Sequence, residues 1–556
     1  MAGGSSACFA LLAIVALSRG HEFLKAVPKE LKERISEEDI RSSLLEEVEG
    51  TLGSGAASHR LRLLEATLKP MYDALPKNEH GNLDHSAVRY ALHRLFILRH
   101  GWSIKGLARD STEAELSSPA GILKDQVPAY IQSTFEQRLG DTGLGLHELA
   151  IMASTLEHLI HKEAVGRLGD VYSIYNLLPS SMVRESTGFE LLDTYMMAFI
   201  LGESLGNLTA YDARHIIGEM PELYLAWKDT QTFVRRIHSN ITQTSVGSSS
   251  QLSFSTLAKV IEVVGEEFGS FQDVECRQLK DKLMKMESGA TGRVKISDFY
   301  KPALGGGWQF QESLGYLRQL GALDESDPNS TSVIIVNYLH SQTNCIASSG
   351  YYSVCCKDEC ESLFGQLEEK IAAPEATPST IVSIVEAMAS STVKSSRQIS
   401  AKMKTHLADI AALHGGMVPL HGRLFAQWMH HAYPRECPYP HVASNLSPEE
   451  WLDETTEEAI ASEEEMQSFT NVTDSAATEV LARGEDLMPW SQEEELLVVQ
   501  TSSGFAPDFT LQYEAGWSPF MRSILLLAVA GSMALTLIQF VNPSTPEKGA
   551  QGTKHL

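Results

Sequence analysis

Residues 254–304, FSTLAKVIEVVGEEFGSFQDVECRQLKDKLMKMESGATGRVKISDFYKPAL, carry two helical patterns with a glycine-containing loop between them. Apolar residues recur at three- and four-residue intervals from Phe254 to Phe268, which predicts a helix with one buried face. A second helix is expected directly after the loop, and Pro302 should cut it short because proline cannot continue a helix. This stretch therefore predicts a helix–loop–helix unit.

Similar helical spacing extends through the N-terminal part of the chain. The segments YALHRLFILRHGW (90–102), LGLHELAIMASTLEHLIHKEAVGRL (144–168) and FELLDTYMMAFILGESL (189–205) all have apolar residues on one helical face. Met196 and Met197 fit a packed core better than a cofactor site, since they follow this spacing. The segment STSVIIVNYL (330–339) is the best strand candidate, and because it is short the start of a helix is the alternative. The fold class predicted is mainly α.

Composition shifts divide the chain into eight segments. The polar, Gly/Ser-rich stretch 240–253 has no periodicity and predicts a linker. The predicted order is a signal peptide (1–18), a helical domain (19–239), the linker (240–253), a helical segment around the 254–304 stretch (254–328), a Cys/His-rich helical module (329–441), an acidic stalk (442–522), a transmembrane helix (523–541) and a cytoplasmic tail (542–556).

The two ends of the chain predict a single-pass membrane protein with its N-terminus outside the cytosol. An apolar run from Ala7 to Leu17, followed by Ser18 and Gly20, is typical of a cleaved secretory signal. Residues 523–541, SILLLAVAGSMALTLIQFV, are long enough as a helix to cross a bilayer. The location predicted is therefore a secretory-pathway or cell-surface membrane.

Sequons and cysteines fit that location. Five acceptor sequons precede the predicted span, at Asn207, Asn240, Asn329, Asn445 and Asn471. Removing the signal leaves six cysteines, Cys276, Cys345, Cys355, Cys356, Cys360 and Cys437, an even number that suits disulfides in an oxidising compartment. The adjacent Cys355 and Cys356 should each bond elsewhere, and the sequence leaves fifteen pairings open.

The charge of the chain excludes nucleic acid as a partner. The net charge is −26, and residues 449–495 hold sixteen acidic residues against one basic residue, Arg483. Such a surface repels the phosphate backbone. The acidic run should bury little apolar surface, which predicts an extended stalk between the folded region and the membrane.

Residues 287–298, ESGATGRVKISD, resemble the calcium loop of the EF-hand family. In that loop, oxygens at positions 1, 3, 5, 7, 9 and 12 bind the ion, and a glycine at position 6 makes the turn. The resemblance assigns positions 1, 5, 7 and 12 to Glu287, Thr291, Arg293 (through its backbone carbonyl) and Asp298. It implies a helix–loop–helix fold and calcium as the candidate ligand.

This loop departs from the family at several positions. Gly289 at position 3 offers no side-chain oxygen, and Lys295 at position 9 places a positive charge beside the expected ion. Asp298 is shorter than the glutamate usual at position 12. We therefore expect the shape of the loop to persist without the metal.

Two further stretches echo the same loop. PKNEHGNLDHSA (76–87) has Gly81 at the turn and Leu83 at the aliphatic position, whereas LGDTGLGLHELA (139–150) has its glycine out of register. If these are related, the N-terminal region and the segment after the linker both derive from helix–loop–helix pairs. Separately, residues 337–441, with YYSVCCKDEC and PRECPYPH, resemble secretory protein families of unicellular eukaryotes, which implies no particular activity.

A histidine-rich stretch, HGGMVPLHGRLFAQWMHHAYPRECPYPH (414–441), offers a candidate copper or zinc site. Its candidate ligands are His414, His421, His430 and His441, beside Met417, Met429, His431 and Cys437. Adjacent His430 and His431 diverge on a helix, and His421 shares a face with Phe425, as a core histidine would. Three prolines around Cys437 favour a disulfide-bonded structural closure. We expect the histidines to scatter.

The sequence favours a binding or structural role over catalysis. It lacks a Gly-x-Ser-x-Gly elbow, a phosphate-cradling glycine loop and a His-Glu-x-x-His pair. The partner expected is an unknown protein or glycan outside the cytosol, in addition to the membrane, and no resident cofactor is assigned. Two alternatives stay open: a metal-dependent enzyme using the 414–441 histidines, and a calcium-binding protein.

Overall fold

The computed structural model describes most of the chain before residue 498. The described residues are 56–105, 107, 142–202, 205–244, 251–287, 289–307, 309–327, 330–341, 344–346, 352–440, 459–470 and 490–497. All of them belong to the unit formed by residues 1–498.

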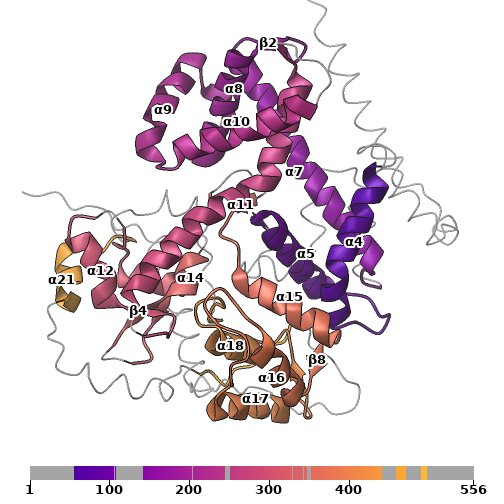
Figure 1. Ribbon diagram of the computed structural model, residues 1–556, viewed down its shortest axis with the longest axis vertical. Helices are drawn as coiled ribbons and strands as arrows, with labels where there is room; N and C mark the ends of the chain where they lie inside the picture. The colour runs from indigo at the N-terminus through magenta and orange to yellow at the C-terminus, as the bar shows by residue number, and fades with distance from the viewer. Residues whose placement is uncertain are drawn as a thin grey trace, which may run out of the picture. The chain divides into compact units, whose positions relative to one another are not determined.

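The described part is mainly helical with a few short strands, as the sequence predicts (Figure 1). The helices are α4 (Ala56–Ala74), α5 (His85–His100), α7 (Leu146–Ile174), α8 (Glu185–Leu201), the 3-10 helix η2 (Leu205–Asn207), α9 (Ala210–Leu223), α10 (Trp227–Thr244), α11 (Phe254–Met286), α12 (Ile296–Leu304), α13 (Leu314–Gln319), α14 (Ile335–Leu339), α15 (Glu359–Ile371), α16 (Pro378–Ala387), α17 (Ala401–Leu413), α18 (Arg423–Ala432) and α21 (Glu463–Thr470).

The strands are two or three residues long. They are β1 (Trp102–Ile104), β2 (Val183–Arg184), β3 (Gln251–Leu252), β4 (Arg293–Lys295), β5 (Leu323–Asp324), β6 (Ser332–Ile334), β7 (Tyr352–Val354), β8 (Glu375–Ala376) and β9 (Val418–Pro419). All their pairings are antiparallel, in the ladders β1–β7, β2–β3, β4–β6–β5 and β8–β9.

Most of these ladders join the loop of one helix–loop–helix unit to the loop of another. We call the resulting assemblies the first to fourth pairs, each defined by the two residues that face each other across its bridge. The bridges are Leu83–Leu144, Val183–Leu252, Val294–Val333 and Ala376–Val418. All eight bridging side chains are buried, with exposures between 0% and 6%.

The bridging residue also fixes where the next helix begins. In the first pair, Asp84 follows Leu83, is the N-cap of α5, and accepts a hydrogen bond from the N–H of Ala87. In the second pair, Ser253 follows Leu252 and caps α11 in the same way. Side-chain oxygens at N-caps satisfy helix N–H groups that have no partner within the helix. Only after Val418 does the helix begin later, at Arg423.

Two long helices each serve two successive pairs. Helix α7 leaves the bridge of the first pair and leads into β2 of the second, and α11 leaves β3 and leads into the third pair. The stripe from Phe254 to Phe268 that the sequence identified lies on α11, and Leu257, Val260 and Phe268 are fully buried. The first three pairs are thus connected by continuous helices, without loops between them.

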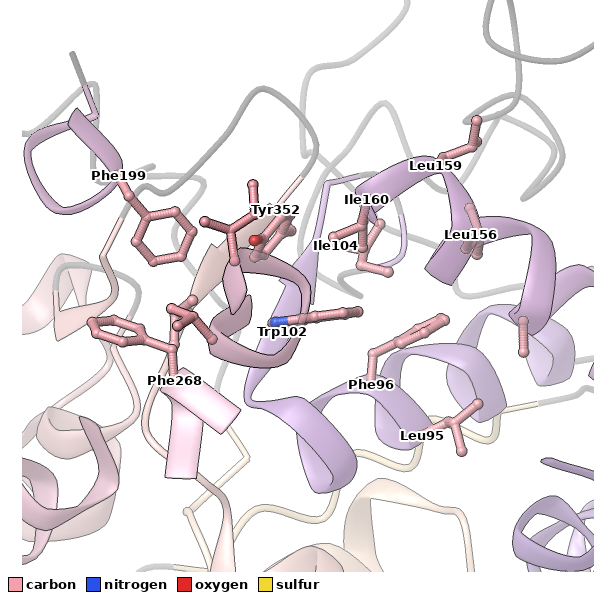
Figure 2. Close-up of a cluster of buried hydrophobic side chains, with 14 of the residues drawn as sticks. Leu95, Phe96, Trp102, Ile104, Leu156, Leu159, Ile160, Phe199, Phe268 and Tyr352 are labelled. Carbon is pink, nitrogen blue, oxygen red and sulfur yellow. The ribbon is translucent and has the colours of Figure 1, made fainter. Parts of the chain in front are cut away.

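The largest core fills the first two pairs and is centred on Trp102. Figure 2 shows this indole between Phe96 of α5, Ile160 of α7, and Tyr352 of β7. The core extends from Leu61 to Phe268 and adds Tyr352 and Val354. The core therefore crosses the predicted boundary between the 19–239 domain and the 254–328 segment, because the N-terminal half of α11 packs in the same core as the helices of that domain.

All six predicted cysteines form disulfides. Cys276 bonds to Cys356, Cys345 to Cys355, and Cys360 to Cys437. The neighbours Cys355 and Cys356 thus bond in different directions, as expected. The Cys276–Cys356 disulfide joins α11 to the segment that follows β7, and the Cys360–Cys437 disulfide joins α15 to the chain after α18.

Three predictions need correction. The linker at 240–253 begins late, because 240–244 complete the last turns of α10 and Ser253 caps α11. The strand predicted at 330–339 ends at Ile334, after which the chain turns into α14. The acidic stretch 442–522 is not an extended stalk throughout, because 459–470 and 490–497 pack on folded helices.

Several predictions fall on residues that the structure does not describe. These are the signal peptide (1–18), the predicted span (523–541), the tail (542–556), His441, and the sequons at Asn329, Asn445 and Asn471. Within the described ranges, no helix combines the length and the apolar character needed to traverse a bilayer. Asn240 lies exposed on α10, and Asn207 ends η2.

Candidate functional site

The 287–298 loop holds an arginine where its resemblance to a calcium loop would place the ion. Glu287, at position 1, is fully buried and accepts a 2.5 Å hydrogen bond from the backbone N–H of Gly292. Its other oxygen accepts two bonds from Arg435, at 2.8 Å from Nε and 2.5 Å from Nη2. Arg435 Nη2 also donates to the carbonyl of Gly289, at position 3, at 3.3 Å. The guanidinium of Arg435, from the segment after α18, thus hydrogen-bonds to the carboxylate at position 1 and to the carbonyl at position 3 of the loop.

The side chains of Asp298 and Arg293 have partners of their own, in α12, in this loop and in β5. Asp298 pairs with Lys301 at 2.5 Å. Arg293 pairs with Asp324 at 2.5 Å and donates to the carbonyl of Thr291 at 3.0 Å. Because hard cations need several oxygens around one point, this geometry disfavours calcium here.

The turn of the loop is closed by the same segment. Gly292 has φ +72°, a conformation that glycine adopts without strain. A Cβ at this position would lie 2.1 Å from the carbonyl oxygen of Pro434, next to Arg435. The loop and the 434–435 backbone therefore fit against each other closely.

The two weaker echoes meet in the first pair. In the 76–87 loop, Leu83 bridges to Leu144, and Gly81 makes the turn with φ +77°. Asn78 Oδ1 accepts from the N–H groups of His80 and Asn82, each at 3.0 Å. In the second echo, 139–150, the residue that bridges to Leu83 is Leu144.

The histidines of 414–441 bind separate partners. His414 Nε2 lies 3.0 Å from Glu494, and His421 Nε2 lies 2.8 Å from Glu368. His430 is fully buried, with Nδ1 2.7 Å from the carbonyl of Cys437, and burial holds its pKa well below the usual range. Among the described residues, no three His, Cys, Asp or Glu side chains gather as a metal site would require.

A buried ionic network connects α5 to α15. Arg94, which is 1% exposed, pairs with Glu361 and with Glu368, the latter at 2.5 Å. Burial raises the pKa of Glu361 to about 7, although Arg94 opposes the shift. Burial also acts to raise the pKa of Glu368, but Arg94 and His421 together lower it. His421 is therefore part of a network that holds the fourth pair to the first.

A second buried carboxylate lies where α4, α5 and α7 meet. Glu157 is fully buried and lies 2.7 Å from Arg60 Nε and 3.4 Å from His100 Nε2. Burial would raise its pKa, but the hydrogen bond from His100 and the charges of Arg60 and Arg99 lower the pKa to about 2. This carboxylate therefore stays ionised inside the core.

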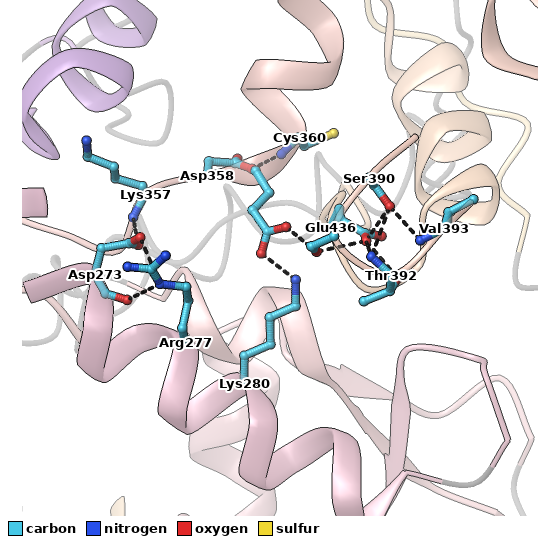
Figure 3. A network of polar contacts seen from close by, with 12 residues as sticks. Asp273, Arg277, Lys280, Lys357, Asp358, Cys360, Ser390, Thr392, Val393 and Glu436 are labelled. Atoms are coloured by element: carbon cyan, nitrogen blue, oxygen red, sulfur yellow. Dashed lines mark hydrogen bonds and ion pairs between the residues drawn. The ribbon is translucent and has the colours of Figure 1, made fainter. Parts of the chain in front are cut away.

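Figure 3 shows a third network beside the Cys360–Cys437 disulfide. Glu436 Oε1 accepts hydrogen bonds from Ser390 Oγ at 2.6 Å, from Thr392 Oγ1 at 2.7 Å and from Thr392 N–H at 3.0 Å. Next to it, Glu359 accepts from Lys280 at 2.5 Å. These bonds organise the loop between α16 and α17 and attach it to α11.

Residues 459–470, the first docked segment, cover the apolar face of the third pair. Ile460 forms a β-bridge with Glu312, supported by bonds from Ser313 N–H to the carbonyl of Ala459 (2.8 Å) and from Ala461 N–H to that of Gln311 (2.7 Å). Helix α21 then lies on α12 (Figure 1). The side chains that the first docked segment adds to the core of the third pair are Ala461 and Met466, with Phe469 packed beside them.

Residues 490–497, the second docked segment, lie on the fourth pair. Leu496 forms a β-bridge with Gly422. Glu494 accepts a 3.1 Å bond from Leu424 N–H and lies 3.0 Å from His414. The indole of Trp490 stacks on His406, with ring centroids 4.2 Å apart.

Sequence reasoning missed the partners of these sites. Arg435, Glu436 and the two docked segments come from stretches whose prolines or acidic composition suggested only a rigid path or a stalk. The apolar residues within the acidic run were the available signal, since Met466 and Phe469 have the three-residue spacing of a helical face.

The comparisons with known proteins returned nothing: no family model, no curated protein and no solved structure matches this chain.

Proposed function

We propose that this protein is a membrane-anchored interaction scaffold of the secretory pathway, built from EF-hand-like pairs that work without calcium. The single observation that carries the proposal is the docking of two acidic segments on the third and fourth pairs. Each of these two pairs holds a segment of the same chain through a β-bridge, a glutamate and an aromatic side chain. Binding surfaces of this kind suit a protein-interaction role better than catalysis.

The placement of the loops supports the EF-hand-like part of the proposal. Val294, the aliphatic residue at position 8 of the 287–298 loop, faces Val333 across a short antiparallel bridge. The turn glycine of the same loop, Gly292, donates its N–H to Glu287 at position 1. The missing oxygens at the other positions, and the bound Arg435, support the calcium-free part.

The cysteines and sequons support the location. Every cysteine in the described residues is disulfide-bonded, and disulfides persist in oxidising compartments. Asn240 is exposed on α10, so a glycan there would not disturb the core. In this proposal the predicted signal directs the chain into the pathway and the predicted span anchors it, with residues 19–522 on the luminal or extracellular side.

Topology is tested by expressing the full chain in a eukaryotic cell. We expect membrane fractionation resistant to carbonate, a mobility shift on endoglycosidase treatment that Asn240→Gln reduces, and no free thiols until reduction. A control variant, Asn176→Gln, changes an asparagine outside any sequon and should leave the glycan shift intact. Recovery from the cytosol with free thiols and no glycan would exclude the proposal.

Calcium independence is tested by calorimetry on the purified chain. We expect no heat of calcium binding in the wild type or in Asp298→Ala, and no change in Tm on adding a chelator. Saturable binding that Asp298→Ala removes would instead support the calcium-sensor alternative. Copper or zinc bound stoichiometrically, and lost in His421→Ala and His430→Ala, would support the metal-enzyme alternative.

A further inference from the structure

We propose that the third pair is a recognition site for an acidic amphipathic helix of a partner protein, and that residues 459–470 are its internal stand-in ligand. This inference deepens the proposed scaffold function and rests on it. The internal segment defines the chemistry of the partner, because every contact that a partner would make is already made by 459–470.

The first contacts of the site are hydrogen bonds to the backbone of the segment. Ser313 N–H and Gln311 C=O bond to the carbonyl of Ala459 and the N–H of Ala461, which adds one extended residue beside the chain that leads into α13. Backbone pairing of this kind gives affinity without demanding particular side chains. The partner therefore needs a short extended stretch before its helix.

Two apolar side chains then anchor the helix. Met466 is 8% exposed and belongs to the core of the third pair. Phe469, one helical turn later, lies beside Tyr300 with ring centroids 6.3 Å apart. Side chains three positions apart share one helical face, so a partner needs apolar residues at this spacing.

An acidic residue completes the recognition pattern. Glu465 Oε1 accepts a 3.2 Å bond from the N–H of Leu314, at the start of α13. On the opposite face, Glu464 and Gln467 are exposed and contribute nothing to the site. Ile460 is 48% exposed and contributes only its backbone, so the ligand pattern is x-Ala-x-x-x-Glu-Met-x-x-Phe, read from 460 to 469.

The second docked segment supports the view that these pairs bind acidic peptides in general. On the fourth pair a β-bridge, a glutamate on a backbone N–H and an aromatic ring recur, in Leu496, Glu494 and Trp490. The order of the three along the chain differs, so the two segments are not copies of one sequence. What they share is the chemistry of recognition.

The proposal is tested with a fluorescent peptide of residues 457–472, EEAIASEEEMQSFTNV, added to the full chain. The double variant Met466→Glu and Phe469→Ser removes the internal anchors, and Gln467→Ala is the matched control on the exposed face. An internal ligand reduces apparent affinity by the fraction of empty sites. We expect the double variant to bind the peptide at least about tenfold more tightly than the wild type and the control.

Amide hydrogen exchange shows where the peptide binds. We expect Ser313 and Leu314 N–H to exchange slowly in the wild type, faster in the double variant, and slowly again with peptide. Equal, weak binding by all three proteins would overturn the proposal. So would loss of protection throughout α12 and α14 that the peptide cannot restore, because the segment would then be an obligatory part of the core. Neither outcome would affect the topology and calcium tests.

Discussion

At the scale of single residues, the pair Glu287–Arg435 has the largest consequences. Glu287 was selected from the sequence as a calcium ligand, and its actual partner lies 148 residues away. No local pattern identifies such a partner, because ion pairing depends on the folded path between the two residues. The sequence therefore indicated which carboxylate needs a cation but not that the chain itself supplies it.

Replacing Arg435 by methionine should destabilise the protein strongly. The variant keeps the aliphatic bulk but leaves Glu287 buried and unpaired, which typically costs about 3–5 kcal/mol. Urea unfolding followed by tryptophan fluorescence measures the loss. Adding Glu287→Gln should recover part of it, whereas Arg214→Met, in a surface pair with Glu190, should cost far less. An equal loss in both single variants would contradict this assignment.

The carboxylate of Glu157 should make stability depend on acid. Its folded pKa of about 2 lies below the ordinary value of 4.5, so it contributes stability above pH 4.5 that is lost as the pH falls towards 2. We expect Glu157→Gln to be less stable than the wild type at pH 6, with the difference shrinking below pH 4. Unfolding curves at several pH values measure this. A difference that is independent of pH would show that the effect is one of packing alone.

At the scale of elements, the helices were largely predictable and their partners were not. The stripe from Phe254 to Phe268 predicted α11, and the glycine loop after it predicted the start of α12, because local periodicity and turn residues encode both. The bridge between Val294 and Val333 depends on a second loop, whose sequence has almost no recognisable ligand positions. The pairing of loops therefore became visible only in the structure.

In the acidic run 449–495, the sequence predicted too little folded structure. Averaged over 449–495, its composition predicts a chain that cannot bury apolar surface. Within the docked segments, however, Met466 and Trp490 each reach a core. Composition describes the average of a segment, whereas docking depends on a few side chains at the right spacing.

The crossing of α5 and α11 should be the element contact least tolerant of change. A Cβ added at Gly269 would lie 1.9 Å from the carbonyl oxygen of His100, so the helices would have to separate. We expect Gly269→Ala to lower stability by about 2–3 kcal/mol. Gly265→Ala, one turn earlier with open space around the new Cβ, should be neutral or stabilising because alanine favours helix. Thermal unfolding of the two variants measures the contrast.

At the scale of the whole molecule, disulfides and ionic networks join elements that lie far apart in the chain. Arg94 connects the first and fourth pairs, and the Cys276–Cys356 and Cys360–Cys437 bridges link residues 80 and 77 positions apart. The sequence predicted all six cysteines as bonded and left their pairing open, since pairing depends on the folded path. The third and fourth pairs are joined mainly by the chain around Cys437.

Removing a disulfide should lower the free energy of unfolding by an amount that grows with the number of residues in the loop that it closes. In the chain-entropy account, a bridge between residues 77 apart contributes about 4 kcal/mol, and one between residues 10 apart about 3 kcal/mol. We expect Cys360→Ser with Cys437→Ser to lose more than Cys345→Ser with Cys355→Ser. The stability lost in the Cys360→Ser, Cys437→Ser variant should also be non-additive with the loss in Arg435→Met, because both variants release the same segment. Additive losses would show that Arg435 is positioned independently of the bridge.

The guanidinium of Arg435 reaches its loop by covalent connection rather than by diffusion. Its effective concentration is set by the length of the polypeptide, so neither dilution nor a chelating agent can strip it away. The cation at this loop is therefore present in every folded copy of the chain, at a ratio of one to one with Glu287.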